Sequence, residues 1–512
     1  MILENGIIRT LEPSLPVARA LPIAGARIAG GVGVHETALA SPERVDLGGR
    51  CVVPGFCDSH VHFPTWAAAQ RHVRLEGTRS LEEALARVKD ALGEPGRGWL
   101  RGRGWRSGDW SPSVEPTKED LDAISGDRPV ALEARDSHSL WLNSAALALA
   151  DGDLQVPGGV VELNDRGEPS GVLREECAWH FRDVHARPTE DELVEASRTA
   201  MKLANARGVT ALHDKDGWLG ALAVFQRLRA DGALSIRVWE SHPGNELEAL
   251  VALPLRSGFG DELLRLGYIK AFMDGTLGSQ TARRLDGSGV EITSKDELAQ
   301  LIVRAAELGF PVAVHAIGDR ANREALDAFE QTQSAWRSRG LRPRIEHAQL
   351  LDASDLPRFA DLGVAASVQF SHAPSDRDLA DRFWAGLTDG AYAYRSLWDS
   401  GALLANGSDA PIEELDPWGG VCAGVLRTND ERPPWHPEQR MTLDQALLAT
   451  CVNPAWLEGE ERRRGKLLPG YLADLVVLDR DPFGVEPEAL PEVRVVATML
   501  GGRWVHHPPP WT

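Results

Sequence analysis

Residues 52–63 read VVPGFCDSHVHF, an apolar run that passes through Pro54-Gly55 and ends in a His-x-His pair. Side chains alternate between the two faces of an extended strand, so His60 and His62 point the same way. Two neutral imidazoles on one side form half of a metal site. Two hydrogen-bonded structural histidines would give the same pattern. The positions of other candidate ligands therefore decide between these interpretations.

The composition is that of an ordinary globular protein with more than one domain or one large barrel. The chain has 512 residues, of which 43% are apolar and 25% are charged. Acidic residues outnumber basic ones by 75 to 55, which gives a formal net charge of −20. A field of this sign repels nucleic acid and anionic membranes, so we expect neither as a partner.

The N-terminus and the cysteines favour a cytoplasmic protein. The first residues lack a basic segment followed by a long apolar run, which excludes an evident signal peptide. No apolar run approaches the ~20 residues needed to span a bilayer. The five cysteines are scattered, odd in number and form no Cys-x-x-Cys pair, so we expect reduced thiols and no disulfide framework.

Strand-like and helix-like segments alternate through the middle of the chain. After the strand that ends at His60, seven short apolar runs begin near residues 209, 236, 268, 311, 344, 364 and 402. Ser294-x-x-Glu297 is a capping box, and Gly309 lies where the matching helix should end. Eight strands with intervening helices predict an α/β fold, a (β/α)8 TIM barrel over residues 52–464.

The two ends of the chain, residues 1–51 and 465–512, consist of short β-like pieces separated by Gly and Pro. Examples are Leu21-Pro-Ile-Ala-Gly and Ala473-Asp-Leu-Val-Val-Leu-Asp. Neither end is long enough to form a strong core alone. We therefore predict that the two ends pair into one small β domain.

The first crossover of the barrel is far longer than one helix requires. We predict an inserted subdomain after the first barrel strand, from about residue 64 to 188. Within it, residues 99–110 read WLRGRGWRSGDW and interleave basic with aromatic side chains. This pattern can form a nucleic-acid face, but on a chain of charge −20 a pocket wall or lid is favoured.

Coordinating or charged residues recur at the C-terminal ends of five predicted strands. In a barrel these ends converge on one rim, where active sites form. Alternation along the strands predicts that Lys270 and His315 point inward, and that Arg344 and Glu346 point outward. The predicted metal site consists of His60, His62, Lys270, His315, His347 and Asp409.

Each of these residues also has a simpler interpretation when it is taken alone. His315 or His347 could be a hydrogen-bonded core residue, Lys270 could pair with Asp274, and Asp409 could cap a turn. Convergence of all six on one rim favours the metal site.

Four motifs resemble the amidohydrolase superfamily: Val53-Pro-Gly-Phe-Cys-Asp-Ser-His-Val-His, Val314-His-Ala-Ile-Gly-Asp, Ile345-Glu-His-Ala-Gln and Asn406-Gly-Ser-Asp-Ala-Pro. Three others resemble its YtcJ-like branch, which includes N-substituted formamide deformylases: Tyr268-Ile-Lys-Ala-Phe-Met-Asp-Gly-Thr-Leu-Gly-Ser, Asn143-Ser-Ala-Ala-Leu after His138, and Gly167-Glu-Pro-Ser-Gly-Val-Leu. The segment from Gly465 to Asp479 is similar to the superfamily's return into its β-sandwich. The resemblance covers essentially the whole chain and implies that residues 1–51 and 465–512 form that sandwich.

The resemblance also implies roles for the six rim residues. His60 and His62 would hold one divalent metal, and His315 and His347 a second. Lys270 is similar to a lysine that is carboxylated in binuclear members and bridges both ions. Asp409 matches an aspartate that is a ligand and the proton shuttle. The imidazole-rich set favours Zn²⁺, and one ion or two stays open.

The expected reaction is hydrolysis of a carbon–nitrogen bond, in a non-peptide amide or formamide-like small molecule, by metal-activated hydroxide. Asp409 would accept the proton of the attacking group and return it to the departing amine. His138 from the insertion, and His213 and His242 at the ends of strands two and three, are candidate contacts for the substrate or its oxyanion.

Two other functions stay open. An amidohydrolase-fold deaminase would carry a glutamate three residues after the strand-five histidine, where this chain has Gly318. A non-catalytic scaffold protein derived from this fold would typically lose metal ligands, whereas all six are present. The physiological substrate is not specified by the sequence, and a homodimer is an open alternative to a monomer.

Overall fold

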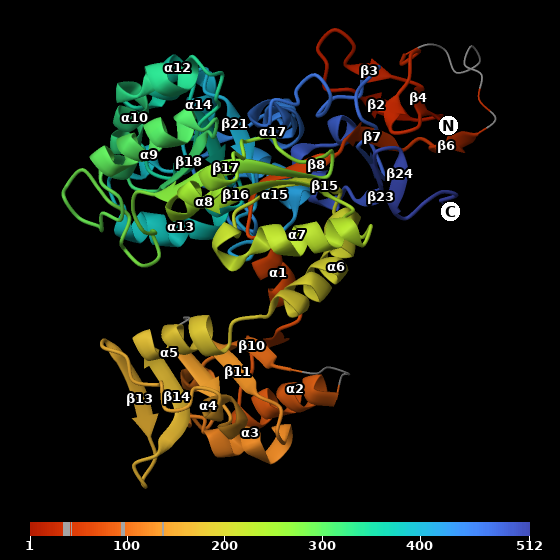
Figure 1. The fold of residues 1–512 in the computed structure, drawn as a ribbon. Helices are drawn as coiled ribbons and strands as arrows, with labels where there is room; N and C mark the ends of the chain where they lie inside the picture. Colours follow the sequence, from red (N-terminus) through yellow and green to blue (C-terminus); the bar gives the residue numbers. More distant parts are fainter. Residues whose placement is uncertain (34–40, 42, 94–97, 136–137, 512) are drawn as a thin grey trace. The chain divides into compact units, whose positions relative to one another are not determined.

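The computed structural model describes residues 1–33, 41, 43–93, 98–135 and 138–511, and divides into two compact units. The first unit contains Met1–Trp66 and Ser197–Thr512, and the second contains Ala67–Ala196 (Figure 1). Two helices, α1 (Phe63–Ala69) and α6 (Glu190–Ala206), contain the boundaries between them. Each unit is described by itself.

The first unit is built on eight parallel strands, as the sequence predicts. Neighbouring strands pair in chain order, beginning with β8 and ending with β21. They are β8 (Phe56–Val61), β15 (Val209–Asp214), β16 (Arg237–Pro243), β17 (Leu264–Phe272), β18 (Val312–Ala316), β19 (Arg344–His347), β20 (Ala365–Val368) and β21 (Leu404–Asn406). Just beyond β21, Asp409 N donates to His60 O at 2.7 Å, and His62 N donates to Ala410 O at 2.9 Å. These bonds join the last strand's exit to β8 and nearly close a TIM-like barrel, which confirms the predicted fold class.

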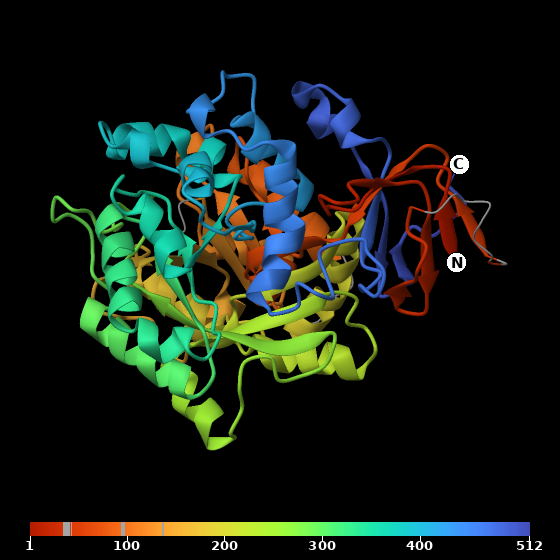
Figure 2. The same ribbon diagram turned by 90° about the horizontal axis from the view of Figure 1, so that it is seen from above.

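Helices follow the strands on the outside of the barrel (Figures 1 and 2). They are α7 (Ala221–Ala230), α8 (Leu247–Ala252), α9 (Lys295–Glu307), α10 (Asp319–Gln331), α11 (Gln333–Arg337), α12 (Leu356–Leu362), α13 (His372–Phe383), α14 (Tyr394–Asp399), α15 (Pro417–Leu426), α16 (Leu443–Leu447) and α17 (Asn453–Leu457). Helix α9 begins as predicted, because Ser294 accepts from Glu297 N and Glu297 accepts from Ser294 N. It is followed by Gly309 at φ +80°, a conformation that favours glycine.

The two termini share strands, which confirms their predicted pairing (Figure 1). One sheet has the order β24-β23-β22-β7-β2-β3, in which β22 (Leu475–Leu478) is antiparallel to β7 (Cys51–Pro54). Its other strands are β2 (Ile7–Arg9), β3 (Val17–Ala18), β23 (Val495–Leu500) and β24 (Arg503–His506). A second sheet contains β5 (Arg27–Ile28), β4 (Leu21–Ala24), β1 (Ile2–Glu4) and β6 (Arg44–Asp46). Side chains of both sheets fill one apolar core, with Leu3 and Leu21 from the second sheet packing among Val52 and Leu475 from the first.

The segment at residues 52–63 belongs to both parts of the first unit. Its first residues lie in β7 of the terminal sheet, and its later residues form β8 of the barrel. Gly55 lies between them, where an added Cβ would stand 2.2 Å from Thr210 Oγ1. Only glycine lets the chain pass so close to β15 without displacing that strand.

The second unit is a six-stranded mixed sheet with short helices. The strand order is β13 (Gly159–Leu163), β14 (Pro169–Glu175), β12 (Ser139–Leu142), β11 (Val130–Ala134), β10 (Leu100–Trp105) and β9 (Val73–Arg74). Its helices include α2 (Leu81–Gly93), α3 (Lys118–Ser125), α4 (Ser144–Ala148) and α5 (Glu176–His180). Trp105 and Trp110 are buried with Trp141 in one core, so these two rings serve packing and not an aromatic nucleic-acid face.

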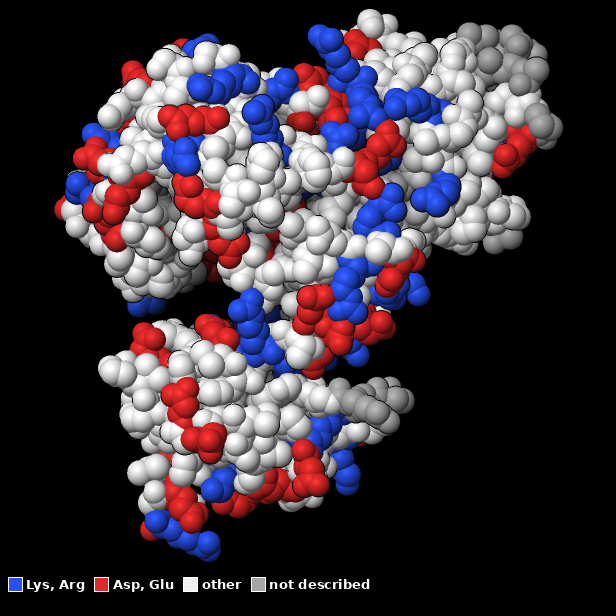
Figure 3. All heavy atoms as spheres, in the orientation of Figure 1, with Lys and Arg blue, Asp and Glu red and all other residues white. Residues whose placement is uncertain are grey.

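The charged surface and the cysteines complete the description of the fold. Acidic and basic side chains are interspersed over the face in Figure 3. All five cysteines are free and buried. Among the described residues, none of the helices combines the length and the apolar character that a membrane span would need. The predicted compartment, the homodimer and the exact domain limits stay predictions.

Candidate metal centre

A cavity of about 370 Å³ opens at the C-terminal ends of the barrel strands, and all six predicted metal ligands line it. The other lining side chains are mainly apolar or neutral: Phe272, Thr276, Leu277, Ile317, Gln349, His372, Leu379 and Ile412, with Asp376 as a further carboxylate. The structure therefore brings together residues that are separated by up to 349 positions in the chain, since the set runs from His60 to Asp409.

His60 and His62 point into this cavity with the same nitrogen. His60 Nδ1 lies 2.8 Å from Glu346 Oε2, and His62 Nδ1 lies 2.8 Å from Asp216 Oδ1. A carboxylate at Nδ1 takes the ring's N–H and leaves the Nε2 lone pair available. The two Nε2 atoms lie 3.4 and 3.5 Å from the same oxygen, Asp409 Oδ1.

His347 and His315 complete the group of imidazoles. The ring centroid of His347 lies 4.7 Å from that of His60 and 4.5 Å from that of His315. His60, His347 and Asp409 each offer a ligand atom within 4.8 Å of the others. His347 Nδ1 bonds to Gln369 Oε1 at 2.9 Å, which again leaves Nε2 as the free lone pair.

Lys270 is buried, and its Nζ has no hydrogen-bond partner among the described residues. Burial lowers the pKa of Lys270 to about 8, against the opposing effect of Glu346 and Asp409. The simpler pairing with Asp274 is not formed, because that carboxylate accepts from the backbone N–H groups of Ile317 and Gly318.

Burial and charge set the protonation of the histidines and of Asp409. Burial lowers the pKa of His60 to about 3, so this ring is neutral at pH 7. Burial also acts to lower the pKa of His62, but Asp216 and Asp409 outweigh it and raise that pKa to about 10. For Asp409, burial is outweighed by His60 and the other rings, and the pKa is held well below its usual range. A metal at this site would therefore displace a proton from His62.

The prediction that Arg344 and Glu346 face outward is wrong. Both side chains are buried inside the barrel, and Ile345 instead packs in the apolar core. His347 has a φ of +74°, which breaks strand alternation so that Glu346 and His347 both turn inward. Asp409 has a φ of +59°. Left-handed backbone at such residues stores strain that the surrounding structure must hold.

Of the three candidate substrate contacts, His213 and His242 belong to the first unit and do not line this cavity. His213 is fully buried, with Nε2 at 2.8 Å from Glu458 Oε1 and Nδ1 at 2.9 Å from Arg344 Nη1. His242 Nε2 lies 2.7 Å from Glu240 Oε2. His138 belongs to the second unit and lies 2.8 Å from Glu175. Their proposed contact with substrate stays a prediction.

Sequence reasoning missed His372, which lines the cavity and has its Nε2 atom 3.9 Å from Asp409 Oδ2. It also missed the carboxylates Asp216 and Glu346 that orient the ligands. His372 follows the seventh strand by a few residues, so the rule applied to the other strand ends would have identified it.

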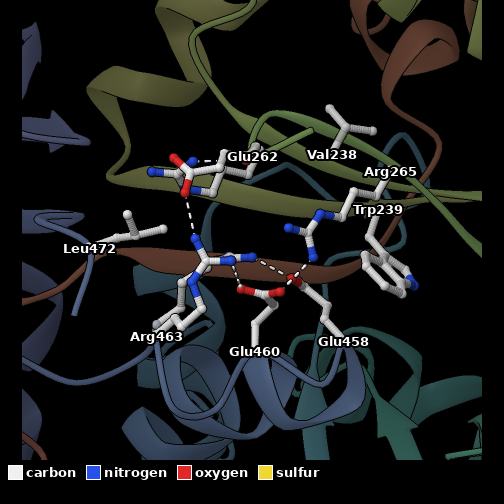
Figure 4. Close-up of a pocket in the computed structure, with 10 residues that line it drawn as sticks. Val238, Trp239, Glu262, Arg265, Glu458, Glu460, Arg463 and Leu472 are labelled. Carbon is white, nitrogen blue, oxygen red and sulfur yellow. Dashed lines mark hydrogen bonds and ion pairs between the residues drawn. The ribbon is translucent and has the colours of Figure 1, made fainter. Parts of the chain in front are cut away.

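Two other polar clusters among the described residues lie away from this cavity and contain ion pairs. A pocket of about 20 Å³ at the N-terminal ends of β16 and β17 is filled by ion pairs, with Glu460 between Arg265 and Arg463 (Figure 4). Cys57, His213 and Glu458 also approach one another. Arg464 pairs with Glu458 there, and the positive charge of its guanidinium would repel a metal ion.

Comparison with known proteins places this geometry in a family. The model of the amidohydrolase family matches residues 43–506. The chain belongs to the amidohydrolase family. This amidohydrolase is 32% identical to the Arabidopsis thaliana protein LONG AFTER FAR-RED 3, over 99% of its own length and 91% of that protein.

Two bacterial relatives confirm the resemblance to the YtcJ-like branch. The amidohydrolase is 30% identical to YtcJ of Bacillus subtilis, with 91% of this chain and 90% of YtcJ covered. It is 28% identical to the N-substituted formamide deformylase of Arthrobacter pascens, with 98% and 97% covered. Among solved structures, an uncharacterized metal-dependent hydrolase from Pyrococcus furiosus superposes with a TM-score of 0.81 at 32% identity, covering 94% of this chain and 99% of that one.

Proposed function

We propose that this amidohydrolase is a metal-dependent hydrolase that cleaves the carbon–nitrogen bond of a non-peptide amide or formamide-like small molecule. The observation that carries the proposal is the convergence of His60 Nε2 and His62 Nε2 on Asp409 Oδ1, at 3.4 and 3.5 Å. Carboxylates fix the opposite nitrogen of each ring, which is the arrangement expected around metal-binding histidines. The name of the Arthrobacter relative supports the choice of bond.

The donor set suits a divalent metal, and its imidazole content favours Zn²⁺. His60 and His62 would hold one ion with Asp409, and His315 and His347 a second. When bound, such a cation supplies a Lewis acid that polarises a carbonyl and makes a coordinated water more acidic.

Lys270 would bridge two ions as N6-carboxylysine. A buried amine with a pKa of about 8 is partly neutral at pH 7, and only the neutral amine attacks CO₂. The new N–C bond forms as the nitrogen loses one proton to solvent, and the product is an anionic carbamate. This change turns a cation that would repel metal into an oxygen ligand.

Asp409 is the proposed proton shuttle. The neighbouring imidazoles keep it ionised, so it can accept a proton from water that attacks the substrate carbonyl. It then returns this proton to the departing nitrogen as the carbon–nitrogen bond breaks. The same carboxylate thus acts first as base and then as acid.

Two rival functions, a deaminase and a non-catalytic scaffold, can each be weighed against the hydrolase. A deaminase would need a proton donor where this chain has Gly318 at the start of α10. A scaffold protein would need no metal. Ligand retention therefore favours the hydrolase over the scaffold, and Gly318 favours it over the deaminase.

The test begins with elemental analysis of wild type and Lys270→Ala, both prepared with bicarbonate and zinc. Near two metals in wild type and fewer in Lys270→Ala would support the carboxylated bridge. One metal in both would indicate a mononuclear enzyme and reopen the deaminase, and none in either would favour the scaffold.

Turnover is then measured on a panel of amides, formamides and lactones, with metal-replete Asp409→Asn as the comparison. We expect the substitution to lower kcat by about 10²- to 10⁴-fold, because the base and acid are lost together. Wild-type turnover by Asp409→Asn would contradict the assignment of Asp409 as the proton shuttle.

A further inference from the structure

His372 is a buried cavity residue whose two ring nitrogens have different environments. It is the first residue of α13 and is 4% exposed. Its Nδ1 lies 3.0 Å from Gln349 Nε2, whereas its Nε2 has no hydrogen-bond partner among the described residues. A buried polar atom without a partner carries a desolvation cost, so this one calls for an explanation by function.

His372 differs from three of the proposed metal-binding histidines in the kind of atom that faces its Nδ1. Acceptor oxygens face Nδ1 in three of those rings: Glu346 at His60, Asp216 at His62 and Gln369 Oε1 at His347. In His372 the neighbour is the amide nitrogen of Gln349, which can only donate. With the Gln349 amide in this orientation, Nδ1 accepts and the ring proton lies on Nε2. In these three ligand rings Nε2 is the nitrogen that can give a lone pair to a metal, in His62 once its proton is displaced, whereas His372 offers an N–H.

The two carboxylate oxygens of Asp409 face different histidines. Its Oδ1 faces the Nε2 atoms of His60 and His62. Its Oδ2 lies 3.9 Å from His372 Nε2 and 3.9 Å from His347 Nδ1, too far for a hydrogen bond with either. The attacking water and the leaving nitrogen, which exchange protons with Asp409, are both bonded to the carbonyl carbon in the tetrahedral adduct, so the oxygen on that carbon would lie within reach of the His372 N–H.

We propose that His372 is a catalytic residue that donates a hydrogen bond from Nε2–H to the reacting carbonyl oxygen of the substrate. As water adds to the carbonyl carbon, the C=O electron pair moves onto this oxygen, and the N–H stabilises the negative charge. His372 keeps its proton throughout, because Asp409 carries the proton from water to the leaving nitrogen. This role rests on the proposed hydrolysis and identifies the substrate group at this position as a carbonyl or its tetrahedral oxyanion.

The surrounding residues hold the ring in place for this role. His372 N donates to Gln369 O at 3.1 Å, and the ring is parallel to that of His347, with 6.4 Å between centroids. Tyr394 Oη donates to Gln369 O at 2.6 Å. A donor that is already oriented stabilises developing charge without reorganisation during the reaction.

The test compares His372→Asn with His372→Gln in the zinc-loaded full chain. Asparagine can place an amide near the position of Nδ1 and keep the contact with Gln349, but it does not reach the position of Nε2. Glutamine reaches that position and supplies an N–H. His507→Ala, on the exposed C-terminal segment, is the surface-histidine control.

Two measurements are made on each protein: hydrolysis of 4-nitroformanilide, and calorimetric binding of methylphosphonate, a tetrahedral oxyanion that requires no turnover. We expect His372→Asn to lower kcat by about 10²- to 10³-fold with little change in KM, and His372→Gln to recover part of the loss. Methylphosphonate should bind about 10- to 100-fold more weakly to His372→Asn at unchanged zinc content.

The two readouts separate this inference from the proposed function. If wild type leaves 4-nitroformanilide intact but methylphosphonate binding still falls in His372→Asn, the proposed bond class is wrong and His372 keeps its role. Equal methylphosphonate affinity in wild type and His372→Asn, or no binding by wild type, would overturn the role of His372. If His372→Asn loses zinc, His372→Phe is used for the same comparison, because it keeps a ring of similar size without an N–H, and wild-type affinity together with wild-type kcat in His372→Phe would overturn the role of His372.

Discussion

Glu346 determines which nitrogen of His60 faces the cavity, and it also pairs with the basic side chains of Arg344 and Lys215. Its Oε2 accepts from His60 Nδ1 at 2.8 Å, and its Oε1 lies 2.8 Å from Arg344 Nε and 3.2 Å from Lys215 Nζ. Burial acts to raise the pKa of Glu346, but Arg344 and Lys215 outweigh it and hold it well below its usual range. The carboxylate therefore stays ionised and keeps the N–H of His60 on Nδ1.

We expect Glu346→Gln to weaken zinc binding by about 10- to 100-fold, because the amide orients His60 less firmly than the carboxylate does. It should also lower the free energy of unfolding by about 3–5 kcal/mol, since the buried guanidinium of Arg344 loses its counter-charge. Zinc titration against a chelator and urea unfolding would measure the two effects. Glu438→Gln, whose side chain is 60% exposed, is the control. Wild-type zinc affinity in Glu346→Gln would contradict this orienting role.

At the scale of elements, strand alternation was enough to place some ligands and not others. The His-x-His spacing at the end of β8 and the alternation around Lys270 in β17 and His315 in β18 follow from extended backbone alone. All three strands deliver their side chains to the cavity. In β19 the alternation is broken by the left-handed backbone of His347, which is held by neighbouring strands and has no signal in the local sequence.

In the inserted segment, too, the local sequence did not predict how the side chains pack. Its alternating basic and aromatic residues resemble a binding face, yet Trp105 and Trp110 pack in a core with Trp141, more than 30 positions further on. Burial of that kind depends on which distant strands meet. The terminal sheets were predictable for a different reason, because each end plainly lacked a core and needed the other.

The passage from β7 to β8 depends on one small residue. We expect Gly55→Ala to lower the free energy of unfolding by about 1–3 kcal/mol through overpacking, because the added Cβ would lie 2.2 Å from Thr210 Oγ1 and 2.8 Å from Thr210 Cβ. The matched control is Gly30→Ala, where an added Cβ meets nothing within 4 Å. Urea unfolding of both variants beside wild type makes the comparison. Equal stability of the two variants would show that β15 moves aside at no cost.

At the scale of the whole first unit, buried charges connect the metal centre to the terminal sheets. From Glu346 the contacts continue through Arg344, His213, Glu458 and Arg464 to Asp474, which precedes β22. Asp474 Oδ2 lies 2.7 Å from Arg237 Nε on β16, and Asp474 Oδ1 accepts from Gly501 N at 2.8 Å. This carboxylate therefore ties the terminal sheet to the barrel.

Asp474 should make the first unit sensitive to acid. Burial acts to raise the pKa of Asp474, but Arg237 and Arg464 outweigh it and lower the pKa below the reference value of 3.8. A folded-state pKa below the unfolded one stabilises the protein fully above pH 3.8, and this stabilisation is lost as the pH falls through the folded value. At pH 7, Asp474→Asn should lower the free energy of unfolding by about 3–5 kcal/mol, because Arg237 loses its buried partner. The difference from wild type should begin to shrink below pH 3.8, where the unfolded carboxylate takes up a proton, and should go on shrinking until the pH passes the lower folded-state pKa.

Urea unfolding between pH 3 and pH 7, on chelator-treated proteins so that loss of metal in acid does not contribute, would follow this difference. Asp378→Asn is the control, because the Asp378 side chain is 74% exposed beside Arg432 and its pair should contribute little at any pH. If the gap between wild type and Asp474→Asn is the same at pH 3 as at pH 7, its cause is lost packing and not the charge of Asp474. A gap that closes in acid would assign the coupling between the terminal sheet and the barrel to the Asp474–Arg237 ion pair.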